Sequence, residues 1–228
     1  MMPDAGSGAT HRPGADAGNV AVAVVPLRAG GKTRLAGVLG AAERERLVTV
    51  LARHVVGALL AEVPVLVVTG DPGFAARALE PAPRLRLVPQ PPDRPGLNAA
   101  VALGRDAAAA AGASRLLVAH ADLPLLTAAD VRALLAPAAP VVLAPDRAGE
   151  GTNALVLDTD ARSFAFRFGP GSRAAHAAEA ARLGLGVELV RRAGTAADLD
   201  TPEDWAALPG DVRDRLRSAV VGTPHEVS

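Results

Sequence analysis

VAVAVVPLRAGGKTRL, residues 20–35, joins an apolar run to a glycine-rich turn. The backbone N–H groups of Gly30 and Gly31 can approach an anion closely, because no Cβ intervenes, and a nearby cation neutralises phosphate charge. That cation is Lys32, the single lysine among the 24 basic residues. A strand, such a turn and a following helix together predict a phosphate-binding site. The alternative is that Lys32 is a solvated surface residue.

Short apolar runs alternate with longer helical patterns after this stretch. The clearest helix is expected over residues 41–61, where apolar side chains recur on one face and Glu and Arg lie opposite. The remaining helices and the strands are expected over these residues: helices 98–111, 127–135 and 172–183; strands 20–25, 65–69, 85–88, 115–119, 140–144, 154–158 and 187–191.

Strands that are apolar on both faces and alternate with helices predict an α/β fold, with a single-domain, mostly parallel, doubly wound sheet of the Rossmann-like type. Ligands of such sheets bind at the carboxyl ends of the strands. The loops after Val25, Ala119 and Ala144 are therefore expected to share one edge of the sheet.

The domain is expected to span residues 20–208, with a C-terminal helix and tail over 209–228. A chain of 228 residues is long enough for one such domain with a well-buried core. Residues 1–19 are rich in Gly, Ala, Pro and Asp and carry no periodic apolar positions. They cannot bury enough surface to offset the entropy of ordering, so we expect a disordered tail there.

The composition excludes several classes of protein. The 24 basic and 24 acidic residues balance, so no global field draws the chain to nucleic acid or to an anionic membrane. The absence of cysteine removes disulfides, thiolate catalysis and Cys-zinc sites. No apolar run reaches the roughly 18 residues of a membrane span, and the first residues lack the pattern of a signal peptide. We expect a soluble cytoplasmic protein with neither nucleic acid nor membrane as a partner.

The turn after residue 25 is not a P-loop. Gly31-Lys32-Thr33 matches the end of that motif, but the glycine required five residues before Gly31 is Pro26. The run Leu27-Arg-Ala-Gly-Gly-Lys-Thr-Arg-Leu35 instead resembles the L-A-A-G-x-G-T-R-M loop of nucleotidyltransferases that activate sugars and pterin cofactors. The resemblance implies that Leu27, Gly30 and Gly31 wrap the nucleotide and that Arg34 lies against its phosphates. Lys32 stands where the pattern has glycine, so the backbone wrap could differ there.

A second candidate site is His120-Ala-Asp-Leu-Pro-Leu-Leu-Thr127, directly after the expected strand over 115–119. Asp122 is a natural Mg²⁺ ligand there, because Mg²⁺ takes one or two carboxylates together with substrate phosphates. The alternative is that Asp122 only opens a turn. His120 could be a second ligand or a phosphate contact, but a hydrogen-bonded residue at a strand end is the simpler interpretation.

Acidic residues near the C-terminus form the third candidate site. Thr201 is expected to cap a helix that begins at Pro202. Asp198 and Asp200 precede it, and we expect them to lie on opposite faces of a short extended segment, so that one of them faces Asp122. Asp200 is the predicted partner, with a shared Mg²⁺ offsetting the repulsion between the two carboxylates.

Together with further segments, these motifs identify a family. The chain resembles the MobA-like nucleotidyltransferases, and within them the 2-phospho-L-lactate or phosphoenolpyruvate guanylyltransferases of coenzyme F-420 biosynthesis, from about residue 20 to residue 205. The most diagnostic segments are Lys32-Thr-Arg-Leu35, Leu97-Asn-Ala-Ala100, Ala121-Asp-Leu-Pro124, Asp146-Arg-Ala-Gly-Glu-Gly-Thr-Asn153 and Phe166-Arg-Phe-Gly-Pro-Gly-Ser172.

The resemblance implies that Thr152, Gly169 and Ser172 hold the phosphate of an acceptor. Ser172 is expected to open a helix, whose free N–H groups form an anion site, although a simple N-cap would use the same groups. The resemblance also implies that Asn98 contacts the base or the ribose, with a helix cap as the alternative. Some relatives carry an acid at the position of His120, so the coordination of a second metal ion is in doubt here.

The expected reaction is transfer of GMP from GTP to the phosphate of phosphoenolpyruvate or 2-phospho-L-lactate. In this expectation Asp122 and Asp200 hold Mg²⁺, while Lys32 and Arg34 neutralise the departing pyrophosphate. A phosphate monoester is ionised near neutral pH, so no general base is required. Two alternatives remain: a related enzyme that acts on a molybdopterin cofactor, and a non-catalytic nucleotide-binding protein.

Overall fold

The computed structural model describes residues 20–221 and contains one seven-stranded sheet, in the order β3-β2-β1-β4-β6-β5-β7. The predicted tail over 1–19 lies outside the described residues, as do residues 222–228. All seven strands lie where the apolar runs predict them, with boundaries shifted by two residues or fewer. They are β1 Ala21–Leu27, β2 Val65–Thr69, β3 Leu85–Pro89, β4 Arg115–Ala119, β5 Val141–Pro145, β6 Thr152–Asp158 and β7 Val187–Leu189.

The sheet is mostly parallel, which confirms the predicted fold class. β1 pairs in parallel with β2 and β4, β2 with β3, and β5 with β7. β6 alone runs in the opposite direction, between β4 and β5. The carboxyl ends of β1, β4 and β5 therefore share one edge, as expected, and the reversed β6 begins at that edge. Residues at the start of β6 consequently lie beside residues that follow β4.

The helices include every helix that periodicity predicts. They are α1 Ala41–Leu60, α3 Leu97–Ala110, α4 Ala128–Leu135, α5 Ser172–Arg182, α7 Pro202–Ala207 and α8 Gly210–Val221. Three short elements have no counterpart among the predictions: the 3-10 turn η1 Thr33–Gly37, α2 Pro72–Ala78 and α6 Ala193–Ala196. These span only four to seven residues, too few for an apolar period of 3.6 to repeat.

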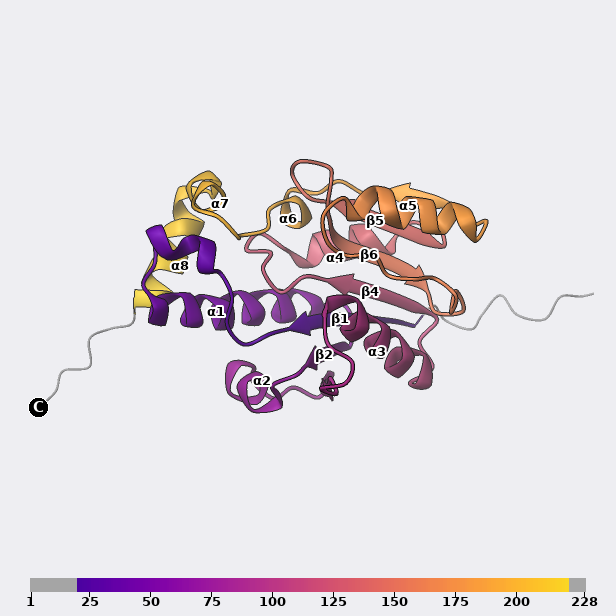
Figure 1. Cartoon of the computed structure of the whole chain (residues 1–228), viewed down its shortest axis with the longest axis horizontal. Helices are drawn as coiled ribbons and strands as arrows, with labels where there is room; N and C mark the ends of the chain where they lie inside the picture. Colours follow the sequence, from indigo (N-terminus) through magenta and orange to yellow (C-terminus); the bar gives the residue numbers. More distant parts are fainter. Residues whose placement is uncertain (1–19, 222–228) are drawn as a thin grey trace, which may run out of the picture.

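Two apolar layers sandwich the sheet (Figure 1). One face packs against α1, α2 and α4, and the other against α3, α5 and three phenylalanines of the segment 164–168. Gly104 lets α3 lie close to β1, because a Cβ at this position would come within 2.4 Å of Val24 Cγ1. The close fit holds the start of α3 against the sheet edge where β1 ends.

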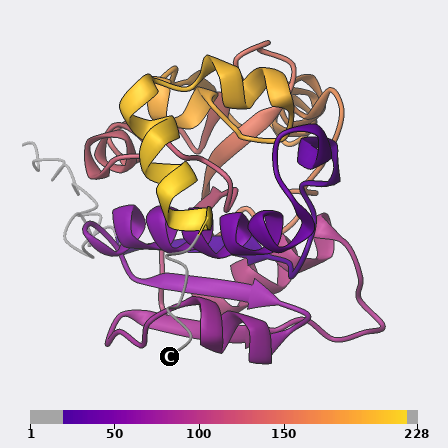
Figure 2. The same cartoon turned by 90° about the vertical axis from the view of Figure 1, so that its left-hand side faces the viewer.

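A third apolar cluster lies beyond the sheet, where α8 crosses α1 (Figure 2). It joins η1, α1, α7 and α8, with Leu35, Leu199 and Trp205 among its buried side chains. The C-terminal helix is thus part of the packed structure. The cluster also fixes the two segments that flank the site described next, η1 after β1 and residues 199–205. No helix within residues 20–221 is long and apolar enough to cross a membrane.

Candidate functional site

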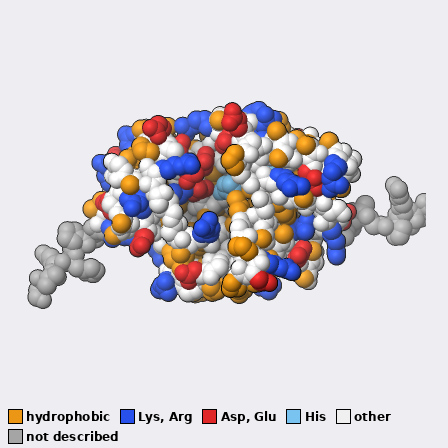
Figure 3. Space-filling view, in the orientation of Figure 1, with side chains coloured by type: hydrophobic (Ala, Val, Ile, Leu, Met, Phe, Trp, Pro, Cys, Tyr) orange, Lys and Arg blue, Asp and Glu red, His pale blue; other side chains and the backbone are white. Residues whose placement is uncertain are grey.

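A cavity of about 740 Å³ opens where β1, β2, β3 and β4 end. Its volume lies in the range of about 300–1,000 Å³ that small-molecule sites occupy. Leu27, Gly30, Gly31 and Lys32 line it, as do His120 and Asp122. Figure 3 shows the surface hollowed near the middle of this face, with a histidine on its floor and acidic and basic side chains around it.

The turn after β1 has three consecutive residues with positive φ. Gly30, Gly31 and Lys32 have φ of 75°, 116° and 57°. Lys32 thus keeps the left-handed backbone that favours the glycine found in the resembling loop, at a cost of about 1–2 kcal/mol for a residue with a Cβ. The backbone wrap is therefore compatible with the glycine pattern, although the residue is lysine.

Lys32 also forms an ionic centre with two distant acids. Its Nζ lies 2.6 Å from Oδ2 of Asp122 and 2.7 Å from Oδ1 of Asp200. The Lys32 side chain is only 9% exposed. Burial alone would lower its pKa, but the two carboxylates outweigh this effect and raise it. Burial would likewise raise the pKa of Asp122, and the Lys32 ammonium more than offsets it, so the carboxyl stays ionised.

The fold holds the two acids of this centre from separate elements. Asp122 follows β4, and its carbonyl accepts a hydrogen bond from Leu199 N–H at 3.1 Å. Asp200 precedes Thr201, which is the predicted cap of α7 and forms a capping box with Asp204. The Asp204 carboxylate also accepts a hydrogen bond from Asp200 N–H at 3.1 Å. The predicted meeting of Asp122 and Asp200 beside the glycine turn therefore occurs, with the Lys32 ammonium between the carboxylates.

Asp198 corrects one expectation from the sequence. Asp198 and Asp200 do not lie on opposite faces: both are half-buried, while Leu199 between them is fully buried. A period of two places alternate residues of an extended segment on the same face. Asp198 accepts a hydrogen bond from Asn153 Nδ2 at 3.2 Å. Burial, and then the fields of Asp122 and Asp200, raise its pKa.

The three carboxylates are of the oxygen-donor type that Mg²⁺ takes. One oxygen, Asp122 Oδ1, is buried and has no hydrogen-bond partner among the described residues. Three carboxylates against one ammonium leave a surplus of negative charge that a divalent cation would offset. Across residues 20–221, however, no three His, Cys, Asp or Glu side chains already converge as a metal-ligand set. The chemistry of Asp122, Asp198 and Asp200 thus fits a magnesium ion, provided that Lys32 gives way.

Thr152 lies at the start of β6 within a buried network. Its Oγ1 is 3.1 Å from Nδ1 of His176, whose ring is fully buried. His176 Nε2 accepts a hydrogen bond from Arg167 N–H at 2.9 Å, so Nδ1 carries the ring proton and donates to Thr152. Burial, and then the charge of His120, lower the pKa of His176 to about 4. The Thr152 oxygen therefore accepts a hydrogen bond from His176 Nδ1–H, and the hydroxyl hydrogen remains available for donation.

The other two residues predicted for an acceptor phosphate, Gly169 and Ser172, lie close to each other in sequence, just before α5 and at its start. Gly169 has φ of 133°, and Gly171, with φ of 68°, is the cap of α5. Ser172 is the first residue of the helix, so the interpretation of Ser172 as a simple N-cap is wrong. Its side chain is buried, with 2% of the residue exposed.

Asn98 uses its amide in a way that the sequence does not predict. Its Oδ1 accepts a hydrogen bond from Phe168 N–H at 2.8 Å, and its Nδ2 donates to Phe168 O at 3.2 Å. The cap of α3 is Gly96, so the capping alternative is wrong. Asn98 does not line the cavity. It joins the start of α3 to the segment that precedes Gly169.

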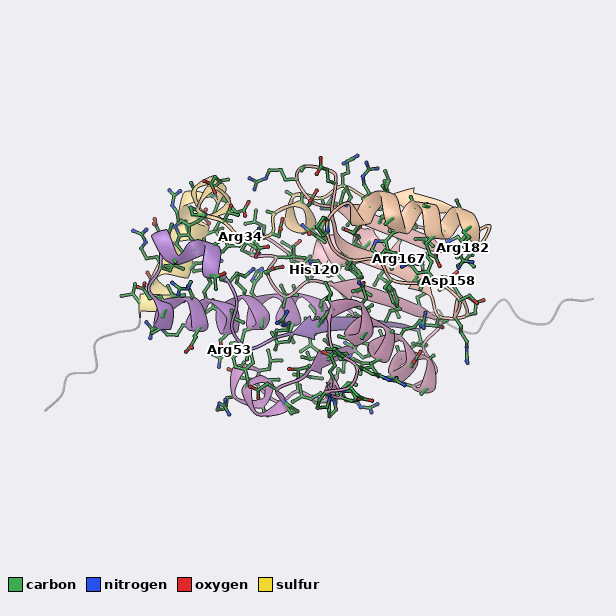
Figure 4. All side chains as sticks on the ribbon, in the orientation of Figure 1. Arg34, Arg53, His120, Asp158, Arg167 and Arg182 are labelled. Atoms are coloured by element: carbon green, nitrogen blue, oxygen red, sulfur yellow. The ribbon has the colours of Figure 1, made fainter. Side chains whose placement is uncertain are left out.

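The cationic side of the cavity differs from the prediction in one residue. Arg34 lies on η1 with an exposed side chain (Figure 4), and it is not among the residues that line the cavity. Arg28 lines it instead. Asp71 and Gln90 also line the cavity and were not singled out from the sequence. All three lie within three residues of the end of a predicted strand, which is the signal that could have identified them.

His120 lies on the floor of the cavity, beyond the end of β4 (Figure 4). Its ring centroid is 5.3 Å from that of Phe168. Its backbone N–H donates to Asn153 O at 3.1 Å, which agrees with the interpretation as a hydrogen-bonded strand end, while its Nε2 is buried without a hydrogen-bond partner in the part of the chain that the structure describes. His120 thus lies between the ionic centre and the Phe168–Gly169 segment.

Comparisons with known proteins find a family and several relatives with similar sequences. Residues 21–209 match the family model described as "Guanylyl transferase CofC like". The phosphoenolpyruvate guanylyltransferase of Rubrobacter xylanophilus is 42% identical over 206 residues, covering 86% of this chain and 98% of that protein. The enzyme of the same name from Sphaerobacter thermophilus is 42% identical over 197 residues, covering 83% and 92%.

Solved structures show the same fold at low sequence identity. A nucleotidyl transferase from Methanothermobacter thermautotrophicus superposes with a TM-score of 0.65 at 22% identity, over 88% of this chain and 99% of that one. The 4-diphosphocytidyl-2C-methyl-D-erythritol synthase of Anaerococcus prevotii has a TM-score of 0.59 at 11% identity, with the same coverage. At such identities the likeness concerns the fold alone.

Proposed function

The chain belongs to the CofC-like guanylyl transferase family, and from this premise we propose that it transfers GMP from GTP to the phosphate of phosphoenolpyruvate, with release of pyrophosphate. The relatives named as phosphoenolpyruvate guanylyltransferases support this acceptor over 2-phospho-L-lactate. A product of this kind would supply the side-chain precursor of coenzyme F-420. The same names argue against a molybdopterin acceptor.

One observation supports the proposal: Lys32 bridges Asp122 and Asp200 at the sheet edge, with the cavity over the ends of β1 to β3 on one side and the start of β6 beyond β4 on the other. The strand order places β3, β2 and β1 on one side of the centre and β4 and β6 on the other. The cavity extends over the ends of β1, β2 and β3, with room for a nucleotide. Thr152 at the start of β6 supplies the acceptor side. Along the sheet edge, from β3 to β6, the proposed order is the base, the phosphates of GTP, the ionic centre and the acceptor.

The main physical difficulty of the reaction is the repulsion between two anionic substrates. Mg²⁺, held by Asp122 and Asp200 with Asp198 beside them, would screen this repulsion and stabilise charge on the α-phosphoryl oxygens. Lys32 is the counter-ion of these acids in the substrate-free protein. The phosphates of GTP compete with the carboxylates for the Lys32 ammonium and would draw it toward the departing pyrophosphate. Arg28 lines the same part of the cavity and adds positive charge.

The acceptor needs positioning more than activation. The Thr152 oxygen already accepts a hydrogen bond from His176, so its hydroxyl hydrogen can be donated to a phosphate oxygen. Gly169 and the free N–H groups at the start of α5 would complete an anion site around it. The acceptor phosphate is ionised near neutral pH and attacks without a general base. Catalysis then rests on orientation and charge compensation.

The proposal is tested by incubating the purified protein with each of the four nucleoside triphosphates and with either acceptor. The expected result is magnesium-dependent pyrophosphate release with GTP and phosphoenolpyruvate, and a product with the mass of the guanylylated acceptor. Release that persists after chelation would contradict the metal requirement. Tight GTP binding in calorimetry without any turnover would favour a non-catalytic nucleotide-binding protein.

A further inference from the structure

We infer that Asp71 and Gln90 recognise the guanine ring of GTP through its two adjacent hydrogen-bond donors, N1–H and the 2-amino group. The inference rests on the proposed use of GTP and concerns the end of the cavity farthest from the ionic centre. Asp71 and Gln90 both line that end. Three arguments support it: the position of the two residues, their remaining hydrogen-bonding capacity and the chemistry of the bases.

The two residues are neighbours at the sheet edge. β2 and β3 pair in parallel up to Thr69 and Pro89, and Gln90 N–H donates to Thr69 O at 2.7 Å. Asp71 follows Thr69 by two residues, so its side chain and that of Gln90 extend from adjacent strand ends. The loop that follows β1 lies two strands away from Gln90, roughly 10 Å at ordinary strand spacing. That separation suits a nucleotide whose phosphates lie at the β1 loop and whose base lies at β2 and β3.

Asp71 presents an acceptor and no donor. Its Oδ1 accepts a hydrogen bond from Phe74 N–H at 2.8 Å as the cap of α2. Its own N–H donates to Thr69 Oγ1 at 3.1 Å. Oδ2 makes no hydrogen bond within the described part of the chain. The other carboxylates that line the cavity, Asp122 and Asp200, are engaged by Lys32, so Asp71 is the acid that remains available to a base.

Gln90 also has no free N–H donor, because its backbone N–H already donates to Thr69 O. Gln90 Nε2 donates to Arg94 O at 2.6 Å and to Gly96 O at 2.9 Å, which uses both amide hydrogens and leaves Oε1 as an acceptor. The next cavity-lining residues of the loop are Pro91, Pro92 and Pro95, which have no backbone N–H. At Asp71 and Gln90 the cavity therefore offers acceptors, whereas the backbone N–H groups of its lining residues Gly96 and Leu97 lie farther along, at the start of α3.

Guanine is the common base that suits such a surface. It presents N1–H and its 2-amino group side by side, whereas adenine presents an unprotonated N1 that two acceptors would repel. We assign the 2-amino group to Asp71 Oδ2 and N1–H to Gln90 Oε1. Once a bound base covers these groups, an unmet or reversed hydrogen bond costs more than a made one contributes, so the arrangement selects against adenine.

The inference is tested with Asp71→Asn. Phe74 N–H requires an acceptor, so the asparagine keeps its Oδ1 at the α2 cap and places its NH₂ where Oδ2 was. That group repels the 2-amino group of guanine and matches the 2-oxo group of xanthine. The expected result is a fall in kcat/KM for GTP of about tenfold to a hundredfold and a rise in kcat/KM for xanthosine triphosphate. The matched control is Asp211→Asn, which changes an exposed acid on α8 away from the cavity.

A second measurement compares inosine triphosphate with GTP in the wild-type protein and in Asp71→Asn. Inosine triphosphate lacks the 2-amino group, so the wild-type protein should use it about tenfold less well than GTP, while Asp71→Asn should use it better than GTP. An unchanged ratio of GTP to xanthosine triphosphate in Asp71→Asn would overturn the inference, even if the wild-type protein is fully active. If the wild-type protein shows no turnover with GTP, the proposed function fails, and the same ratios measured as binding constants by calorimetry still decide the role of Asp71.

Discussion

The two sides of the ionic centre are built differently. On the nucleotide side, a wide cavity is lined by turns that follow β1, β2 and β3, and the turn after β1 offers backbone groups with positive φ. On the acceptor side, a few buried polar side chains, among them Thr152 and His176, are held within an aromatic cluster. A large ligand can be held by many weak contacts along a sheet edge. A small phospho-acid offers few groups, so the residues that bind it must be rigidly oriented.

The first prediction concerns Lys32, which both sides share. Lys32→Met leaves Asp122, Asp198 and Asp200 without their ammonium, so both anionic substrates meet uncompensated negative charge. We expect kcat/KM to fall by about a hundredfold, with a higher KM for GTP and for the acceptor alike, as measured by pyrophosphate release. The matched control is Arg217→Met, which removes an exposed cation on α8. If the KM of only one substrate changed, Lys32 would act on that substrate alone, which would contradict its proposed role toward both.

The second prediction separates the two sides through Thr152. Thr152→Val removes the hydroxyl proposed to bind the acceptor phosphate and leaves the His176 Nδ1 proton without a partner. The KM for the acceptor should rise about tenfold, while the KM for GTP stays near the wild-type value. Thr152→Ser keeps the hydroxyl and should retain most of the activity. Equal effects on both KM values would show that Thr152 supports the fold and does not distinguish the substrates.

The third prediction has the smallest effect on activity and tests the rigidity of the acceptor side. The pKa of His176 is lowered from 6.5 to about 4, so its neutral form stabilises the folded protein fully above pH 6.5. This contribution is lost as the pH falls from 6.5 toward 4, and it is on the order of 2–3 kcal/mol in total. Urea unfolding at pH 7 and at pH 4.5 measures it.

The control for this measurement is His176→Gln, which removes the titrating group. The variant should show a weaker dependence of the free energy of unfolding on pH over this window. His54, whose pKa burial also lowers, contributes to the dependence that remains, as do the carboxyl groups with shifted pKa values. A wild-type protein and a His176→Gln variant with identical pH dependence would contradict the tautomer and burial assigned to His176.

The sequence predicts the two sides unequally well. Apolar runs locate every strand, and the glycine turn, Asp122 and Asp200 stand in short motifs next to strand or helix ends. Lys32 and Asp200 are in contact although they lie 168 positions apart in sequence. Their proximity can be predicted only from the expectation that the carboxyl ends of the strands share one edge of the sheet. The partners of Asn98 and His176 depend on how the segment 164–168 folds back onto α3 and α5. No local pattern encodes that return, because it is set by apolar packing of Phe164, Phe166 and Phe168.

The errors in the sequence interpretation have separate physical reasons. Arg34 is predicted from its place in a motif, but η1 turns it outward, and Arg28 lines the cavity instead. Asp198 was assigned to the wrong face of an extended segment, although the period of two already places it beside Asp200. Asp71 and Gln90 lie in loops without a motif, and the pairing of β2 with β3 brings them together.

The central claim is that the carboxylates of Asp122 and Asp200, with Lys32 between them, form the point where GTP and the acceptor react. The most direct test is the rate of pyrophosphate release from GTP and phosphoenolpyruvate by Asp122→Asn, measured beside the wild-type protein and Asp211→Asn. The account predicts that Asp122→Asn loses activity by about a thousandfold or more while its thermal unfolding midpoint shows that it remains folded, and that Asp211→Asn matches the wild type. Near-normal turnover by a folded Asp122→Asn variant would contradict it.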